Sequence, residues 1–196
     1  MIRYAKDTDR DALMQMWNCC FPEDSDYFLN FYFNTFYSKE ETVVCEENGQ
    51  PVASLQMIPY RLQISNSISQ GGYIFGAMTH PDHRKKGFMA QLLNASFDEM
   101  IKKGFDYTFL IPGEKWLVSM YEKYGFRLLK PNPELPINKV LKSQRQWELI
   151  KQNYFDDYEV WLNEEIYDPK EHKGMIRRLN PNAEEITTLY MGMMLD

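Results

Sequence analysis

The spacing of hydrophobic residues changes along the chain, and each spacing predicts a helix or a strand. Leu13, Met16 and Trp17 recur at helical intervals, and the apolar residues between 89 and 101 show the same period. Helices are predicted after a capping-box pattern at Thr8 and Asp11, over 24–37, from the basic loop at Arg84 to Gly104, and over 114–124. Strands are predicted over 2–5, 42–46, 52–64, 72–78, 107–111 and 126–129.

The order of these elements predicts a mixed α/β fold. Asn48-Gly49 is a strong hairpin-turn signal, so the first strands form an antiparallel meander. A strand–helix–strand–helix–strand series follows it. We therefore expect a central mixed sheet of about six or seven strands flanked by helices.

Residues 131–136, with three prolines, mark a break in composition. Beyond them the sequence predicts a helix over 144–154, a strand over 175–179 and an apolar final segment over 188–195. About sixty residues are few for a separate core. We interpret 1–130 as the main domain and 131–196 as a C-terminal extension packed on it, with the final segment docked against the domain.

Composition narrows the function classes. The chain has 196 residues, 44% of them hydrophobic, and a net charge of −6, which argues for a packed core and against a nucleic-acid partner. The uncharged stretch 62–81 carries too many polar residues for a membrane span. Three cysteines give neither a disulfide framework nor a metal-ligand spacing, and the start of the chain is not a signal peptide. We expect no membrane partner, no metal and a reduced, cytoplasmic setting.

The junction of a strand, a basic loop and a helix around Arg84, Lys85 and Lys86 is the most informative segment. The first N–H groups of a helix lack intrahelical partners, and the helix dipole adds partial positive charge there. Gly87 has no Cβ, so a ligand can approach the backbone closely. A basic loop in an acidic protein favours a small anionic ligand such as a polyphosphate.

Two motifs carry a resemblance to a known family. Arg84–Met89 follows the pattern Arg/Gln-x-x-Gly-x-Gly/Ala, and Tyr121–Phe126 follows Tyr-x-x-x-Gly-Phe. In this order, and with these elements around them, the motifs resemble the GNAT superfamily of N-acetyltransferases over residues 1–130. Within it, the segments 79–84, 110–114 and 121–126 look most like the enhanced intracellular survival branch, whose members usually carry further domains. Met89 departs from the usual Gly or Ala, although bulky residues also fit that branch.

The resemblance implies transfer of an acetyl group from acetyl-CoA to a primary amine by direct attack in a ternary complex. The N–H groups of 85–90 would bind the diphosphate, and the backbone of 77–79 would pair with the pantetheine arm as an added strand. Gly71, Gly72 and Gly76 would ease a bulge in that strand. The expected cofactor-binding residues are Ala77, Met78, Thr79, Arg84, Lys85, Lys86, Gly87, Phe88, Met89 and Ala90.

Tyr121 is the general-acid candidate, because a phenol can protonate the departing coenzyme A sulfur. The other interpretation of Tyr121 is a core tyrosine. The general base stays open. The candidates are Glu23, Asp24, Asp26, Glu114 and the terminal carboxylate of Asp196, and a water chain or an amine that arrives neutral would need none of them.

Several alternatives also stay open. The aromatic helix 24–37 is interpreted mainly as core, with some side chains as a wall of an acceptor cleft. His80 and His83 are expected on a loop surface, and the cysteines as small core residues. Rival functions are an inactive acyl-CoA-binding regulatory module and transfer of a different or longer acyl group. The acceptor is a small-molecule or peptide amine, with cationic amines favoured by the acidic composition, and a homodimer is one option for the oligomeric state.

Overall fold

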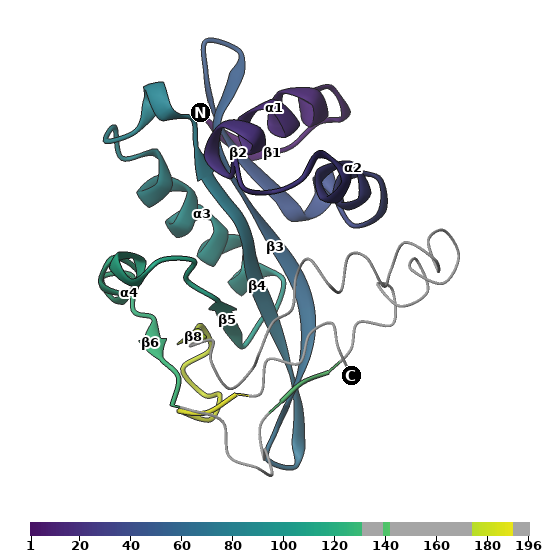
Figure 1. Cartoon of the computed structure of the whole chain (residues 1–196). Coiled ribbons are helices and arrows are strands. Elements are labelled where there is room, and N and C mark those ends of the chain that lie inside the picture. Colours follow the sequence, from purple (N-terminus) through teal and green to yellow (C-terminus); the bar gives the residue numbers. More distant parts are fainter. Residues whose placement is uncertain (131–138, 142–173, 190–196) are drawn as a thin grey trace. The chain divides into compact units, whose positions relative to one another are not determined.

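The computed structural model describes residues 1–130, 139–141 and 174–189 (Figure 1). The predicted helix over 144–154 and residue Asp196 lie outside the described residues. The helices are α1 (Arg10–Cys20), α2 (Asp26–Thr35), α3 (Phe88–Lys102) and α4 (Lys115–Glu122), with 3-10 turns η1 (Asp7–Asp9), η2 (Lys39–Glu41) and η3 (Pro81–His83). The strands are β1 (Ile2–Tyr4), β2 (Thr42–Glu47), β3 (Gln50–Ile64), β4 (Ser67–Thr79), β5 (Tyr107–Leu110), β6 (Arg127–Leu128), β7 (Lys139–Leu141) and β8 (Met175–Arg178).

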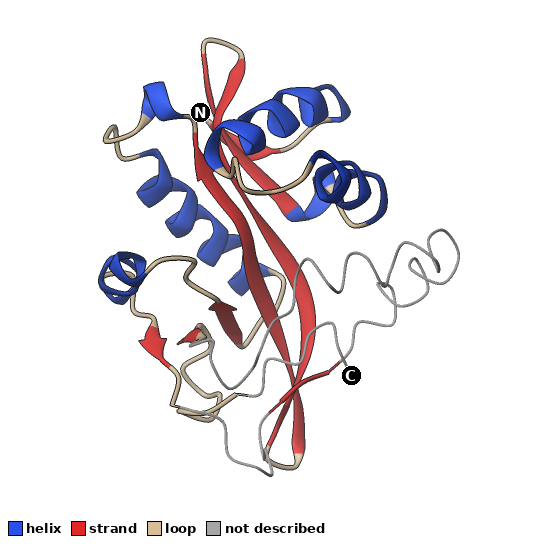
Figure 2. Cartoon of the chain, in the orientation of Figure 1, coloured by secondary structure: helices blue, strands red, loops and turns tan. Residues whose placement is uncertain are grey.

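The strands confirm the mixed α/β class (Figure 2). Within the described residues, hydrogen-bonded neighbours follow the order β1-β2-β3-β4-β5-β8-β6, and β7 pairs with β3. β1, β2 and β3 are antiparallel, whereas β4 and β5 are parallel. The strand predicted over 175–179 is present as β8, and it separates β5 from β6, an arrangement that the sequence pattern did not predict.

The chain forms two compact units. The first holds Met1–Ile58 and Ile74–Glu99, and the second holds Pro59–Tyr73 and the residues from Met100 onward. β3, β4 and α3 each contribute residues to both units. Among the described residues, no helix combines the length and apolar character needed to cross a membrane.

An aromatic cluster forms the core of the first unit. Trp17 of α1 packs against Phe28, Tyr32 and Phe33 of α2 and against Phe75, with ring centroids 5.5 to 6.4 Å apart. The prediction of a mainly buried aromatic helix is therefore confirmed. The helix is shorter than 24–37, because Ser25 caps it by accepting a hydrogen bond from the Phe28 N–H at 3.1 Å.

Two details of this unit correct the sequence analysis. α1 starts at Arg10 and not behind a Thr8 cap, because the carboxylate of Asp9 accepts the Lys6 N–H at 2.7 Å and closes η1 first. Cys45 is buried as expected, but Cys19 is exposed on the outer face of α1, so it is not a core residue.

Tight packing at β4 and β5 defines the second unit. Tyr107, Phe109 and Leu110 of β5 are buried. A Cβ on Gly71 would lie 2.7 Å from a Leu62 methyl carbon, and a Cβ on Gly72 would lie 2.2 Å from the Met100 sulfur. Both glycines pair in regular register with β5, so the expected bulge is not at these two positions. They are needed for close packing.

Candidate functional site

The basic loop connects η3 to α3 in the first unit. The helix starts at Phe88, directly after the basic loop, as the sequence pattern predicted. Lys85 and Gly87 adopt left-handed backbone conformations, with φ of 65° and 81°, and a helix cannot continue through them. The three cations therefore precede the helix and do not lie in its first turn.

Gly87 stands at the N-cap position of α3, where its carbonyl accepts the Gln91 N–H at 3.2 Å. The N–H groups of Phe88, Met89 and Ala90 consequently have no acceptor within the helix. A Cβ on Gly87 would meet no atom within 4 Å, so the space above the loop is open. Left-handed residues near a helix start turn backbone N–H groups toward a common point, which suits an anion. The residues present fit a diphosphate.

Arg84 turns toward the end of β4 and the end of α1. Its Nε donates to the carbonyl of Thr79 at 3.2 Å, and its Nη2 lies 3.8 Å from the Cys20 sulfur. Cys20 donates to the same carbonyl at 3.4 Å, and burial raises the pKa of its thiol. The carbonyl of Thr79 thus already has two donors. Of the three residues expected to pair with the pantetheine arm, Ala77 and Met78 are therefore better suited than Thr79 to accept its hydrogen bonds.

Glu47 lies beside the basic loop, and the sequence analysis missed it. Its Oε2 is 2.8 Å from His83 Nδ1 and 3.5 Å from Lys86 Nζ. His83 Nδ1 is buried and has no hydrogen-bond partner of acceptable geometry among the described residues, although the Glu47 carboxylate lies beside it. His83 and His80 are half-buried in and before η3, and the expectation of plain loop surface was too simple.

The strand before the loop is irregular at one position. Gly76 has φ of 55° within β4, a conformation that interrupts a regular strand directly before Ala77. A Cβ there would lie 2.6 Å from Cζ3 of Trp17. Of the three glycines expected to ease a bulge, Gly76 alone has a positive φ among the described residues.

Trp17 links this position to one of the carboxylates. Its Nε1 donates to Oδ2 of Asp24 at 2.7 Å, so the indole spans from Gly76 to Asp24. Asp24 is half-buried, whereas Glu23 and Asp26 are exposed. In the second unit, Glu114 is exposed and accepts from Trp116 Nε1 at 2.8 Å. Asp24 is therefore the candidate with the best-defined position in the first unit.

Tyr121 lies on α4 in the second unit and is buried, with 6% of its surface exposed. Burial raises the pKa of its phenol to about 12. The ring packs edge-on against Phe126, with centroids 5.6 Å apart, and the Tyr121 carbonyl accepts the N–H groups of Tyr124 and Phe126 at 2.9 and 3.3 Å. Gly125 closes this turn with φ of 79°. These hydrogen bonds and the left-handed Gly125 explain why Gly and Phe follow Tyr121 at this spacing in the second motif. The position of the Tyr121 side chain is compatible with a catalytic tyrosine and with a core tyrosine.

Two further observations concern other kinds of site. In the part of the chain that the structure describes, no three His, Cys, Asp or Glu side chains are grouped as a metal site would need. A cavity of about 150 Å³ in the second unit is lined in part by Arg127, Arg178 and Glu185. It contains none of the site residues predicted from the sequence.

Comparison with known proteins gives a match over the first two thirds of the chain. Residues 1–129 match the model of an acetyltransferase (GNAT) domain. No curated protein matches the chain.

Solved structures of low sequence identity share the fold. A GNAT family N-acetyltransferase (YhbS) of Escherichia coli, solved with CoA, has a TM-score of 0.63 and 14% identity over 97% of this chain and 88% of that one. The ribosomal-protein-S18-alanine N-acetyltransferase of E. coli has 0.57 and 14% over 95% and 97%. Eis1 of Mycobacterium abscessus has 0.57 and 11% over 64% and 31%.

At these identities the likeness establishes the fold and no more. The chain spans only 31% to 36% of the length of four matched structures, Eis1 among them. The activity and acceptor of those longer proteins therefore do not transfer directly.

Proposed function

The chain belongs to the GNAT acetyltransferase family, and on this premise we propose that it transfers an acetyl group from acetyl-CoA to a primary amine by direct attack in a ternary complex. The observation that carries the proposal is the open N-cap at Gly87, where the first N–H groups of α3 have no acceptor within the helix, no atom lies within 4 Å of a Cβ position, and a loop with three cations directly precedes the helix. The presence of CoA in the solved E. coli relative supports the choice of ligand.

Acetyl-CoA, the acetyl donor, would be bound mainly by backbone groups. The N–H groups of Phe88 to Ala90 would hold the diphosphate, with charge supplied by Arg84, Lys85 and Lys86. Ala77 and Met78 would offer backbone groups to the pantetheine amides. Met89 is half-buried in the first turn of α3, so its side chain does not fill the space above Gly87 completely.

The chemistry needs one proton donor and one proton acceptor. Acetyl-CoA supplies an acetyl thioester. As the amine nitrogen bonds to the acetyl carbon, the carbon–sulfur bond breaks, and the hydroxyl of Tyr121 would give its proton to the departing thiolate. The amine loses a proton at the same stage. Because the pKa of Tyr121 is raised to about 12, its hydroxyl carries the proton at neutral pH.

Asp24 is the group that we assign to the acceptor. Trp17 fixes one carboxylate oxygen, so the other is oriented without a counter-cation among the described residues. An oriented carboxylate near the irregular position of β4 would bind an ammonium group or take its proton. The acceptor would thus be a cationic small-molecule or peptide amine, in line with the acidic composition. Membership of the enhanced intracellular survival branch is also part of this proposal, and it rests on the sequence segments 79–84, 110–114 and 121–126. The fold does not select this branch, because Eis1 and the S18-alanine N-acetyltransferase have the same TM-score.

The direct test measures thiol release from acetyl-CoA with a panel of amines, together with CoA binding by calorimetry. Binding with amine-dependent thiol release supports the proposal. Binding without thiol release for any amine would favour the rival, a regulatory module that keeps the ligand site. Faster release from a longer acyl-CoA would favour the second rival. If CoA does not bind, both the proposed ligand site and the proposed acetyl transfer are contradicted.

A further inference from the structure

β8 lies beyond the segment that matches the family model, yet it is placed between two strands of that segment. It pairs antiparallel with β5 on one side and with β6 on the other (Figure 1). Side chains alternate between the two faces of a strand, so Arg177 and Arg178 point in opposite directions. Their different faces give them different partners.

Arg177 reaches the turn that ends α4. Its Nη1 donates to the carbonyl of Tyr124 at 2.7 Å. α4 ends at Glu122, so this carbonyl belongs to the turn where helix carbonyls lack intrahelical partners. A cation at the C-terminal end of a helix also interacts favourably with the helix dipole. The contact joins residues 53 positions apart in sequence.

The same side chain lies near Gly125. A Cβ on Gly125 would lie 3.7 Å from Arg177 Nε and 3.8 Å from its Cδ. Gly125 itself adopts φ of 79°, so the turn depends on a left-handed residue that the arginine covers. The guanidinium thus holds the turn by its hydrogen bond to the Tyr124 carbonyl and lies on the side of Gly125 where a Cβ would project.

That turn is bonded directly to the backbone of Tyr121. The N–H groups of Tyr124 and Phe126 both donate to the Tyr121 carbonyl, at 2.9 and 3.3 Å. A chain of contacts therefore runs from Arg177 through Tyr124 to Tyr121. A shift of the turn would move the Tyr121 ring, which packs against Phe126.

We propose that Arg177 is a positioning residue for Tyr121, supplied by the segment beyond the family match. The inference rests on the proposed function, because it assigns to Arg177 the orientation of the group that would protonate the thiolate. It extends that function by giving the described part of the C-terminal extension a role in turnover. Small displacements of catalytic groups reduce rates strongly, which is why a positioning contact affects turnover.

The experiment compares Arg177→Met and Arg177→Lys with Arg178→Met as the matched control. Arg178 is the next residue on β8 and donates to the Ala183 carbonyl at 3.2 Å and not to the turn that ends α4. We expect Arg177→Met to lower kcat about tenfold with KM for acetyl-CoA unchanged. Arg177→Lys should recover most of the loss, because one donor serves the one carbonyl. Arg178→Met should keep the parent kcat.

A double-mutant cycle decides whether Arg177 acts through Tyr121. In a Tyr121→Phe background, Arg177→Met should cause no further loss of kcat, because the group that it orients is gone. Equal losses in the two backgrounds would overturn the proposal.

A readout without turnover separates this inference from the proposed function. If the parent itself shows no thiol release, the proposed function fails, and NMR of the Tyr121 ring still tests the positioning. We expect Arg177→Met, or Arg177→Gln if the first variant does not fold, to shift the Tyr121 ring signals and to speed amide exchange at 124–126, whereas Arg177→Lys should stay close to the parent. Unchanged signals and exchange would overturn the positioning role.

Discussion

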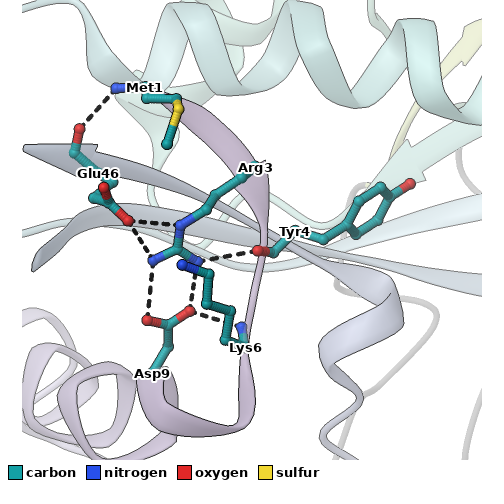
Figure 3. Close-up of polar contacts among 6 residues, drawn as sticks. All are labelled: Met1, Arg3, Tyr4, Lys6, Asp9 and Glu46. Atoms are coloured by element: carbon teal, nitrogen blue, oxygen red, sulfur yellow. Dashed lines mark hydrogen bonds and ion pairs between the residues drawn. The ribbon is translucent and has the colours of Figure 1, made fainter. Parts of the chain in front are cut away.

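Arg3 donates to both carboxylate oxygens of Asp9, at 2.6 and 3.1 Å (Figure 3). Its Nε donates to Glu46 at 2.6 Å, so one guanidinium connects β1 with η1 and with β2. The side chains of Arg3 and Asp9 are only 14% and 7% exposed. This bidentate pair fixes the first strand of the unit that carries the basic loop.

Replacing Asp9 by Asn should therefore destabilise the protein in a pH-dependent manner. The hydrogen bond from Arg3 lowers the pKa of Asp9, so the pair adds stability above the unfolded carboxyl pKa of about 4 and loses it as pH falls through the lower folded value. We expect Asp9→Asn to lower the free energy of unfolding by about 2 kcal/mol at pH 7. Urea unfolding across the acid range should show this gap closing.

The control for this pair is Asp11→Asn. Asp11 is 89% exposed and lies 3.9 Å from Arg10, so the change should stay within about 0.5 kcal/mol at every pH. A pH-independent loss for Asp9→Asn would show that shape and not charge matters at this position.

Features set by nearby residues were predicted correctly from the sequence. The Asn48-Gly49 turn is present with φ of 52° and 80°, as its dipeptide signal requires. The period of the residues from Phe88 to Lys102 gave a helix that buries Leu92 and Leu93. Backbone sterics and side-chain period act over a few residues, so a single sequence carries them.

Features set by distant contacts could not be predicted. The contact between Glu47 and Lys86 joins residues 39 positions apart in sequence. The contact between Cys20 and Thr79 joins residues 59 positions apart. Neither residue type carries a local signal for such a partner, because an exposed glutamate and a solitary thiol are common anywhere. The placement of β8 between β5 and β6 has the same cause, since strand order depends on tertiary packing.

Gly76→Ala should be more harmful than a glycine substitution at a turn. At Gly76 the new Cβ would lie 2.6 Å from the Trp17 ring at φ of 55°, so backbone strain and overpacking combine, and we expect a loss of about 3 kcal/mol. Gly49→Ala has φ of 80° and no atom within 4 Å, so strain alone should cost about 1 kcal/mol. Thermal or urea unfolding measures both. Equal losses of stability in the two variants would mean that the Trp17 ring moves aside at no cost in free energy.

Glu47→Gln should strengthen CoA binding. The carboxylate lies 2.8 Å from His83 Nδ1 and 3.5 Å from Lys86 Nζ, where its charge offsets the loop cations and repels a ligand phosphate. We expect the Kd for CoA to fall about threefold at low salt, and less at high salt, because salt screens exposed charges. Glu122→Gln, an exposed change of equal charge, is the control. Weaker binding in Glu47→Gln would mean that Glu47 orients the loop.

Gly87→Glu should abolish CoA binding while the protein stays folded. A side chain at Gly87 meets no protein atom within 4 Å of its Cβ, so the free protein suffers only the strain of φ 81°, about 1 kcal/mol. A carboxylate there would occupy the open space and repel phosphates. Gly87→Ala carries the same strain without the charge and should weaken binding far less. Calorimetric titration with CoA compares the three proteins, and parent-like affinity in Gly87→Glu would move the site elsewhere.

Tyr121→Phe tests the general acid and the core interpretation in one variant. It keeps the buried ring and its contact with Phe126 and removes only the proton donor. We expect kcat to fall about 100-fold with little change in KM for acetyl-CoA, the loss usual for a general acid. Because burial raises the pKa of Tyr121 to about 12, the phenol keeps its proton through the neutral and mildly alkaline range. The parent should therefore show no fall in kcat from this group between pH 7 and about 10. Tyr124→Phe, one turn away and half-buried, should match the parent. A drop in melting temperature with unchanged kcat in Tyr121→Phe would identify the residue as a core tyrosine and leave the thiolate to be protonated by water.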